Sequence, residues 1–290
     1  MRICSAKIIV VAALSTAAGV VFAAPLVNES FENGMPSSVP GVLSWCPERG
    51  NVYVGSDPID GSRVIPYQGQ LSLAMVHRGK EDGQDSSNEC RFNTFASTDE
   101  VWVSFNFRVP DNFYHRSQDS SANNKWFVLW TDEYESQGLT VAFEYWPDGS
   151  GGSRLAYRWV RNGDRVPGHQ GHSQFIRVPE DRGKWMHFVM HVKRASSSTS
   201  SDGVIQTWIR REGASTYTKL HDVNNAPLSV SGMSQTFNSG YLMGWANSGF
   251  DQDTKFYVDN FVLSRESLLG AQTAPDESPP KPPTGVSATN

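Results

Sequence analysis

The chain carries little charge and no surplus of positive charge. Of its 290 residues 19% are charged, and 25 Lys and Arg stand against 30 Asp and Glu, for a formal net charge of −5. Because a nucleic-acid-binding surface needs clustered basic residues, this composition argues against nucleic acid as the partner. The 38% hydrophobic content, with 15 Phe, 9 Trp and 9 Tyr, excludes a disordered chain and a coiled coil.

Long hydrophobic runs are also scarce, and the one that exists lies at the start of the chain. Arg2 and Lys7 precede an apolar run over residues 8–21, and Val21-Phe22-Ala23 fits a small-x-small cleavage site. This pattern predicts a signal peptide over residues 1–23. The run is too short and too rich in alanine for a membrane anchor, and no later segment suits a membrane span. We therefore expect a secreted protein, extracellular or periplasmic.

Cysteine is rare, with three residues in the whole chain. Cys4 leaves with the signal peptide, so Cys46 and Cys90 remain, and two thiols in an oxidising compartment most simply form one disulfide. A metal pair or a catalytic thiol would need neighbouring residues that are absent from the sequence around them. Such a disulfide would stabilise the fold by roughly 3–4 kcal/mol.

The chain contains no convincing amphipathic helix and no internal repeat. Instead, apolar residues alternate with polar ones, as strands require, and turn signals such as Pro147-Asp148-Gly149 separate the segments. The predicted strands cover residues 101–108, 125–131, 139–146, 155–161, 185–193, 204–210, 241–245 and 256–263. Many strands without helices predict an all-β fold, a two-sheet antiparallel β-sandwich of the jelly-roll type. This domain spans residues 24–269, and the proline-rich residues 270–290 form a linker or tail.

Four segments resemble concanavalin A-like jelly rolls. They are Ser30–Gly34, the pair Val101–Pro110 and Asn124–Trp130, the pair Gly183–Val189 and Asp202–Ile209, and Phe256–Leu263. The resemblance is particularly to polysaccharide lyases of the heparin-, alginate- and glucuronan-lyase type, and it extends to laminin G-like carbohydrate-binding modules. Where these lyases carry a catalytic Gln-x-His pair, this chain has Leu129-Trp130-Thr131. The Glu-x-Asp-x-x-Glu signature of jelly-roll glycoside hydrolases, which would supply a carboxylate pair, is also absent.

A lyase would need a cation to neutralise the substrate carboxylate, a base to take the C5 proton and an acid for the leaving oxygen. The sequence offers His187 or His115 as the base, a tyrosine such as Tyr157 as the acid, and Arg158 or Lys125 as the cation. Residues 108–194 hold 12 Lys and Arg, 10 Asp and Glu and five His, a slightly basic stretch that suits an anionic glycan. The competing interpretation makes His187 and His191 half-buried residues on an exposed sheet face, and the tyrosines packing residues.

Candidates for sugar binding are aromatic or cationic side chains that share strand faces. His187, His191 and Lys193 are separated by even numbers, as are Gln206, Trp208 and Arg210 on the strand expected to pair with theirs. Arg154 and Arg158 share one face of their strand, and Tyr157, Trp159 and Arg161 share the other. The expected sugar-binding residues are His191, Trp208, Arg210, Trp130, Trp146 and Trp159. The tryptophans could equally fill the core.

A structural Ca²⁺ is a further expectation, because related sandwiches often hold this ion where the first and last strands meet. Glu32 and Asp259 match those positions and supply the hard oxygen ligands that the ion prefers. For zinc, no suitable His/Cys spacing is present in the sequence.

The sequence thus leaves three functions open. The first is a secreted protein that binds an acidic extracellular polysaccharide on its concave sheet. The alternative is a polysaccharide lyase that cleaves uronic-acid-containing glycans by β-elimination, and the third is a laminin G-like domain that contacts protein. The proline-rich tail favours a modular protein and therefore the binding function.

Overall fold

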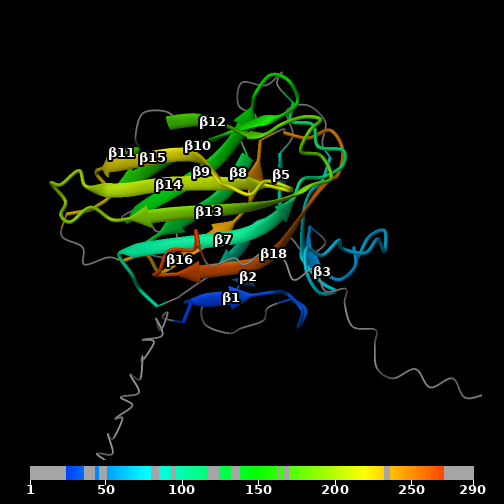
Figure 1. The fold of residues 1–290 in the computed structure, drawn as a ribbon, viewed down its shortest axis with the longest axis horizontal. Coiled ribbons are helices and arrows are strands. Elements are labelled where there is room, and N and C mark those ends of the chain that lie inside the picture. Colours follow the sequence, from blue (N-terminus) through cyan, green and yellow to red (C-terminus); the bar gives the residue numbers. More distant parts are fainter. Residues whose placement is uncertain are drawn as a thin grey trace, which may run out of the picture.

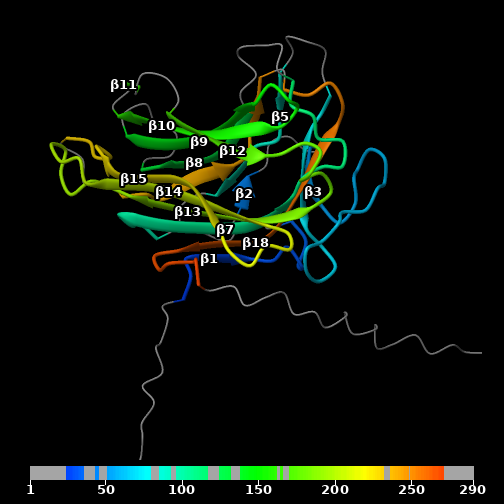
Figure 2. The same cartoon turned by 45° about the horizontal axis from the view of Figure 1, so that its top comes forward.

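The protein is a jelly-roll β-sandwich of two antiparallel sheets (Figures 1 and 2). The structure, a computed structural model, describes residues 24–35, 43–45, 51–79, 85–92, 96–116, 124–131, 138–161, 164–165, 170–231, 236–247 and 249–270. Within these ranges the chain forms eighteen strands and no helix. The prediction of an all-β sandwich is therefore confirmed.

The first sheet has eight strands in the order β15-β14-β13-β7-β18-β4-β3, with β1 beside β18. Its strands, in chain order, are β1 (Val27–Glu29), β3 (Val52–Val54), β4 (Leu73–His77), β7 (Glu100–Arg108), β13 (Trp185–Lys193), β14 (Gly203–Arg211), β15 (Thr218–Ala226) and β18 (Thr254–Ser264). The predicted pairing of residues 185–193 with residues 204–210 is confirmed as the β13–β14 hairpin.

The second sheet has ten strands in the order β11-β10-β9-β8-β16-β6-β2, with β12, β17 and β5 attached at its margins. Its strands, in chain order, are β2 (Leu43–Trp45), β5 (Ser86–Ser87), β6 (Cys90–Phe92), β8 (Asn124–Trp130), β9 (Leu139–Pro147), β10 (Ser153–Arg161), β11 (Asp164–Arg165), β12 (Gln170–Ile176), β16 (Ser239–Leu242) and β17 (Trp245–Ala246). In Figure 2, β10, β9 and β8 of this sheet lie above β14, β13 and β7 of the other.

The core lies between the sheets and is rich in aromatic rings. On β7 the inward-facing side chains of Phe105 and Phe107 are wholly buried, and their ring centroids lie 5.6 and 4.8 Å from that of Trp126 on β8. Each such side chain stabilises the fold by about 1.5–3 kcal/mol through burial alone. Because the core holds both sheets rigidly, each sheet can present a fixed pattern of side chains on its outer face.

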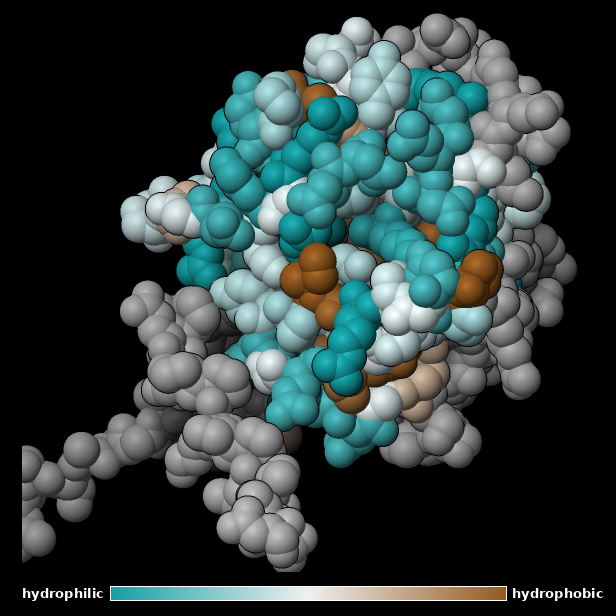
Figure 3. Space-filling model, turned by 90° about the vertical axis from the view of Figure 1, so that its right-hand side faces the viewer, coloured by the Kyte–Doolittle hydropathy of each residue, from teal (hydrophilic) through white to brown (hydrophobic). Residues whose placement is uncertain are grey.

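Large hydrophobic side chains are seldom exposed among the described residues. Ile59, Trp245 and Tyr114 are the most exposed. Figure 3 shows the end of the sandwich near β3 and β5 as mainly hydrophilic, with hydrophobic residues in small scattered groups. A large apolar docking patch is therefore not apparent on this face. In the described part of the chain, none of the secondary structure is a helix with the length and hydrophobicity that a membrane span requires.

Three predictions fall wholly or partly on residues outside the described ranges. The signal peptide over 1–23 and nearly all of the tail over 270–290 lie outside them, and so does Cys46. Its expected partner, Cys90, is buried on β6. Trp45, the residue before Cys46, pairs with Arg91, the residue after Cys90, so the strand register supports the predicted disulfide, which stays a prediction.

Candidate active site

One row of paired residues crosses the outer face of the ten-stranded sheet. Arg91 on β6 lies opposite Tyr241 on β16, which lies opposite Val128 on β8; Val128 in turn lies opposite Ala142 on β9, and Ala142 opposite Arg158 on β10. Adjacent strands are about 4.8 Å apart, so the row spans about 19 Å from end to end. Its middle consists of two small apolar side chains, with a tyrosine and an arginine on one side and an arginine on the other.

Trp130 fixes the tyrosine side of this row. Its ring centroid lies 5.3 Å from that of Tyr241, and Val128, Trp130, Ala142 and Tyr241 together form a buried cluster on this face, separate from the main core. The Arg91 guanidinium lies 5.9 Å from the centre of the Trp130 ring and forms an ion pair with Glu89. The tilted contact between the two rings, with the cation near Trp130, restricts the orientation of the tyrosine.

Two cations share a buried carboxylate on the other side of the row. Glu144 on β9 is wholly buried, and its Oε1 atom accepts hydrogen bonds from Lys125 Nζ and, at 3.0 Å, from Arg158 Nε. The side chains of Lys125 and Arg158 are 18% and 19% exposed, so they still reach solvent. Because one negative charge faces two positive charges, the cluster carries a net positive charge at the surface.

This arrangement can bind an acidic sugar chain and move a proton. A substrate carboxylate can accept hydrogen bonds from Lys125 or Arg158, and these charge-assisted bonds are among the strongest available to a protein. Tyr241 on the same row carries a hydroxyl, a group able to transfer protons, and the side chains between it and Arg158 are the small Val128 and Ala142. The face therefore combines a cation and a proton donor at fixed separation.

The structure brings together only some of the residues that the sequence indicated. Lys125, Arg158, Trp130 and Trp146 all lie on this outer face, the last at the end of β9 with its ring near His172. Lys125 and Arg158, which the lyase hypothesis offered as alternative cations, share one site. Trp130 is only 2% exposed, so it supports Tyr241 rather than offering an open stacking surface.

The predicted His187, His191, Trp208 and Arg210 lie elsewhere, on the outer face of the eight-stranded sheet. There the ring of His191 stacks on Trp102 with centroids 4.1 Å apart, and Trp102 stacks on Trp208 at 5.7 Å. The predicted alternation along β13 and β14 is confirmed, and His187 and His191 are buried on a sheet face. However, the two outer faces point away from each other, so His187 cannot act together with Lys125 and Arg158.

His115, Tyr157 and Trp159 point into the interior. His115 is wholly buried, and its Nε2 atom lies 3.2 Å from Asn124 Nδ2. Tyr157 packs against His221 and Trp159 in the core, and burial raises the pKa of its hydroxyl. The inward face of β10 was predicted as a shared face, but a sandwich covers that face with the other sheet. These residues therefore do not reach a substrate on the outer face.

Sequence reasoning missed Glu144, Arg91 and the importance of Tyr241. Glu144 shares a strand face with Ala142 and Trp146, as its even spacing predicts. A carboxylate within an apolar strand, however, does not indicate which cations face it. Tyr241 and Arg91 belong to strands 150 residues apart in sequence, and only their pairing reveals a common site. A charged residue predicted within a buried strand is the signal that could have identified Glu144.

The expected calcium ligands, Glu32 and Asp259, accept hydrogen bonds from the backbone of one loop. Glu32 accepts hydrogen bonds from the N–H groups of Gln70 and Leu71, and Asp259 accepts them from Tyr67 and Gln68 at 2.9 and 3.1 Å. Burial, with the negative charge of Glu32, raises the pKa of Asp259 to about 6. Among the residues that the structure describes, no group of three His, Cys, Asp or Glu side chains could hold a metal ion. The structural Ca²⁺ at Glu32 and Asp259 stays a prediction.

The fold and the outer face together define a jelly-roll protein with cationic and aromatic groups suited to acidic sugars. Comparison with protein families gives a polysaccharide lyase family over residues 58–262, which include Arg91, Lys125, Glu144, Arg158 and Tyr241. Because the match covers more than half of the chain, the protein belongs to the polysaccharide lyase family. No curated protein sequence matches the chain.

Solved structures of similar fold include several lyases. Alginate lyase Aly36B, as a double mutant in complex with alginate tetrasaccharide, is 15% identical with a TM-score of 0.56, and the match covers 84% of this chain and 98% of that one. Aly36B without these mutations gives 15% identity and a TM-score of 0.55, over 83% and 97% of the chains. An endo-β-1,4-glucuronan lyase from the fungus Trichoderma reesei gives 14% and 0.48, over 82% and 94%. At these identities the Aly36B matches show a common fold.

Proposed function

We propose that the protein is a secreted polysaccharide lyase that cleaves a uronic-acid-containing glycan by β-elimination on the outer face of the ten-stranded sheet. The observation that carries the proposal is the cross-strand row, in which Tyr241 faces the Lys125–Glu144–Arg158 cluster across Val128 and Ala142. The row lies within the residues that match the polysaccharide lyase family. The predicted signal peptide suits an extracellular polymer.

The reaction needs charge neutralisation before a proton can be removed. The C5–H bond of a uronate becomes acidic enough only when its carboxylate charge is neutralised, because the carbanion formed at C5 delocalises onto that carboxylate. Lys125 and Arg158 supply positive charge for this step. Glu144 holds both cations in place and cancels only one of the two charges.

Tyr241 is the group proposed to move protons. It takes the C5 proton, the electron pair forms the C4–C5 double bond, and the C4–O bond to the leaving sugar breaks as that oxygen receives a proton. The ion-paired Arg91, opposite Tyr241 in the row, adds positive charge on the same side. To take the C5 proton Tyr241 must enter the reaction as the phenolate, and the hydroxyl formed in that step then donates the proton to the leaving oxygen. One tyrosine can serve in this way as base and then acid when both groups leave from the same side of the ring.

The direct test is the formation of the unsaturated product. Purified protein is mixed with alginate, glucuronan, heparin and pectate, and the ultraviolet absorbance of the new C4–C5 double bond is followed. We expect one or more of these polymers to give a continuous rise with wild-type protein and with Tyr114→Phe, an exposed tyrosine outside the site. Tyr241→Phe should abolish nearly all of the rise.

A protein that only binds polysaccharide would give a different result. It would be retarded in gels that contain the polymer, yet no polymer would yield an unsaturated product. That outcome would remove the lyase proposal and support the binding function. A laminin G-like adhesion domain would give neither retardation nor absorbance.

A further inference from the structure

A second row of paired polar residues lies on the opposite side of the sandwich, on the outer face of the eight-stranded sheet. Arg210 on β14 pairs with His187 on β13, which pairs with Asn106 on β7, and Asn106 pairs with Asp259 on β18. Four adjacent strands thus place four polar side chains side by side. The lyase site uses none of them.

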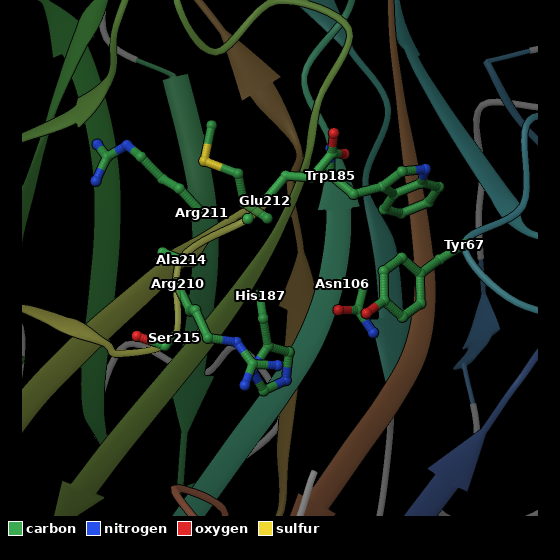
Figure 4. Close-up of a pocket in the computed structure, with 11 residues that line it drawn as sticks. Tyr67, Asn106, Trp185, His187, Arg210, Arg211, Glu212, Ala214 and Ser215 are labelled. Atoms are coloured by element: carbon green, nitrogen blue, oxygen red, sulfur yellow. The ribbon is translucent and has the colours of Figure 1, made fainter. Parts of the chain in front are cut away.

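Three members of the row, Arg210, His187 and Asn106, line a pocket of about 380 Å³, which is within the size range of small-molecule sites. Trp185, Tyr67 and the turn at residues 213–215 complete its walls (Figure 4). The rings of Tyr67 and Trp185 meet edge to face, with centroids 5.3 Å apart. Tyr67 is fixed there because the buried Asp259 carboxylate accepts a hydrogen bond from its backbone N–H.

Two nitrogen atoms in this pocket have no hydrogen-bond partner among the residues that the structure describes. They are Nδ2 of Asn106 and Nε2 of His187, in side chains that are 1% and 3% exposed. Leaving a buried polar atom unpaired costs about 1–3 kcal/mol, so native proteins rarely do so without a functional reason. Both side chains line the pocket, where a bound molecule could pair with them.

The chemistry of the pocket indicates the ligand. Asn106 Nδ2 can only donate, and Arg210 also only donates, so the ligand must offer acceptor oxygens. Tyr217 OH lies 2.6 Å from His187 Nδ1, which leaves Nε2 for the ligand, and burial beside Arg210 lowers the pKa of His187 to about 3. The rings of Trp185 and Tyr67 provide an apolar surface of the kind on which sugar rings pack.

Charge within the pocket favours a carboxylate on one side only. The Arg210 guanidinium lies 5.1 Å from the centre of the Tyr217 ring, at the side where His187 lies. Glu212, at the other side, accepts a hydrogen bond from the backbone N–H of Trp185. The Asp259 carboxylate is occupied by backbone N–H groups. An acidic group can therefore approach Arg210 but is repelled at Glu212.

We propose that this pocket is a second, non-catalytic sugar site that binds one uronate unit, with the sugar carboxylate at Arg210, other oxygens at Asn106 and His187, and the ring against Trp185. The identification of the sugar as a uronate rests on the proposed lyase function. The site itself rests on the unpartnered nitrogens and the pocket.

The test observes the pocket directly, without turnover. ¹⁵N-labelled protein is titrated with the sodium salts of glucuronic, mannuronic and galacturonic acid, each against its neutral counterpart, glucose, mannose or galactose. We expect at least one uronate to shift the Asn106 side-chain amide and Trp185 indole signals in a saturable manner, at least tenfold more tightly than its neutral sugar.

Two variants decide whether the pocket binds the sugar. Arg210→Gln should weaken uronate binding at least tenfold, whereas Arg63→Gln, which removes an exposed arginine, serves as the matched control. Asn106→Leu should abolish the Trp185 shift without lowering the melting temperature, since it removes an unpaired donor. A purely structural Asn106 would instead lower the melting temperature and leave the sugar-induced shift intact.

The proposal is overturned if no uronate shifts these signals, if neutral sugars bind equally well, or if Arg210→Gln binds like wild type. Failure of the lyase function is a separate result, because it is measured by product absorbance and by Tyr241→Phe. Saturable uronate shifts at Asn106 and Trp185 would support the second site even if no polymer were cleaved.

Discussion

Lys125 on β8 and Arg158 on β10 bond to the same oxygen atom of Glu144, on the strand between them. Neither cation therefore depends on substrate for its position. The carboxylate has no solvent exposure, so it acts as a fixed internal anion that holds two positive charges at the surface. Such preorganisation is what stabilises charge in an enolate-like transition state.

Glu144→Gln should destabilise the protein by about 3 kcal/mol, because it leaves two partly buried cations without their counter-charge. Urea unfolding measures this change. The double variant Lys125→Met/Glu144→Gln should recover part of the loss, because one of the two uncompensated cations is gone. A loss of under about 0.5 kcal/mol in Glu144→Gln would contradict the role of this carboxylate.

Tyr241→Phe should lower kcat at least about 100-fold, the usual contribution of a general acid or base, while KM changes little. The phenyl ring keeps its packing against Trp130, so the melting temperature should stay within a few degrees of wild type. Steady-state kinetics on the cleaved polymer, with Tyr114→Phe as the control, measure the effect. A variant with wild-type kcat would exclude Tyr241 as the proton-transferring residue.

Lys125→Met should lower kcat/KM about 100-fold on a polyuronate, the usual effect of removing one preorganised stabilising group. On the methyl-esterified polymer the same substitution should have little effect, because the ester has no charge to neutralise. Comparing the two substrates separates charge neutralisation from loss of folding. Equal losses on the free acid and the ester would show that Lys125 does not contact the substrate carboxylate.

Acid should destabilise the fold through buried His77. Its ring is wholly buried between Tyr145 and Ser86, and burial, with a contribution from His115, lowers its pKa to about 3. The unfolded chain takes up a proton on this imidazole below its ordinary pKa of 6.5, whereas the folded protein does so only near pH 3. The contribution of His77 to stability is therefore fully present above pH 6.5 and decreases by about 1.4 kcal/mol per pH unit as pH falls toward 3.

Urea unfolding at pH 7, 6, 5 and 4 tests this dependence. His77→Gln should flatten the pH profile by about that slope, whatever its effect on absolute stability. His172→Gln, which changes an exposed histidine, should leave the slope as in wild type. An identical slope in His77→Gln and wild type would show that this imidazole does not determine the acid sensitivity.

The strands and their faces could be predicted because alternation is a local property. The predicted strand over 185–193 coincides with β13, and His187 and His191 share a face as expected. Local sequence does not reveal which strand faces are open to solvent. Tyr157 and Trp159, for example, lie on a face that the other sheet covers. The site itself depends on pairing between distant strands, such as β6 with β16, which no short-range pattern determines.

The back-to-back rows have a mechanical consequence. A sandwich that binds acidic sugar on both outer faces is bivalent, and its two binding sites face in opposite directions. A short chain cut on one face could not reach the other, whereas neighbouring strands of a hydrated gel could each occupy one. Such a protein would tether itself to the matrix it degrades and would dissociate as the gel around it dissolves.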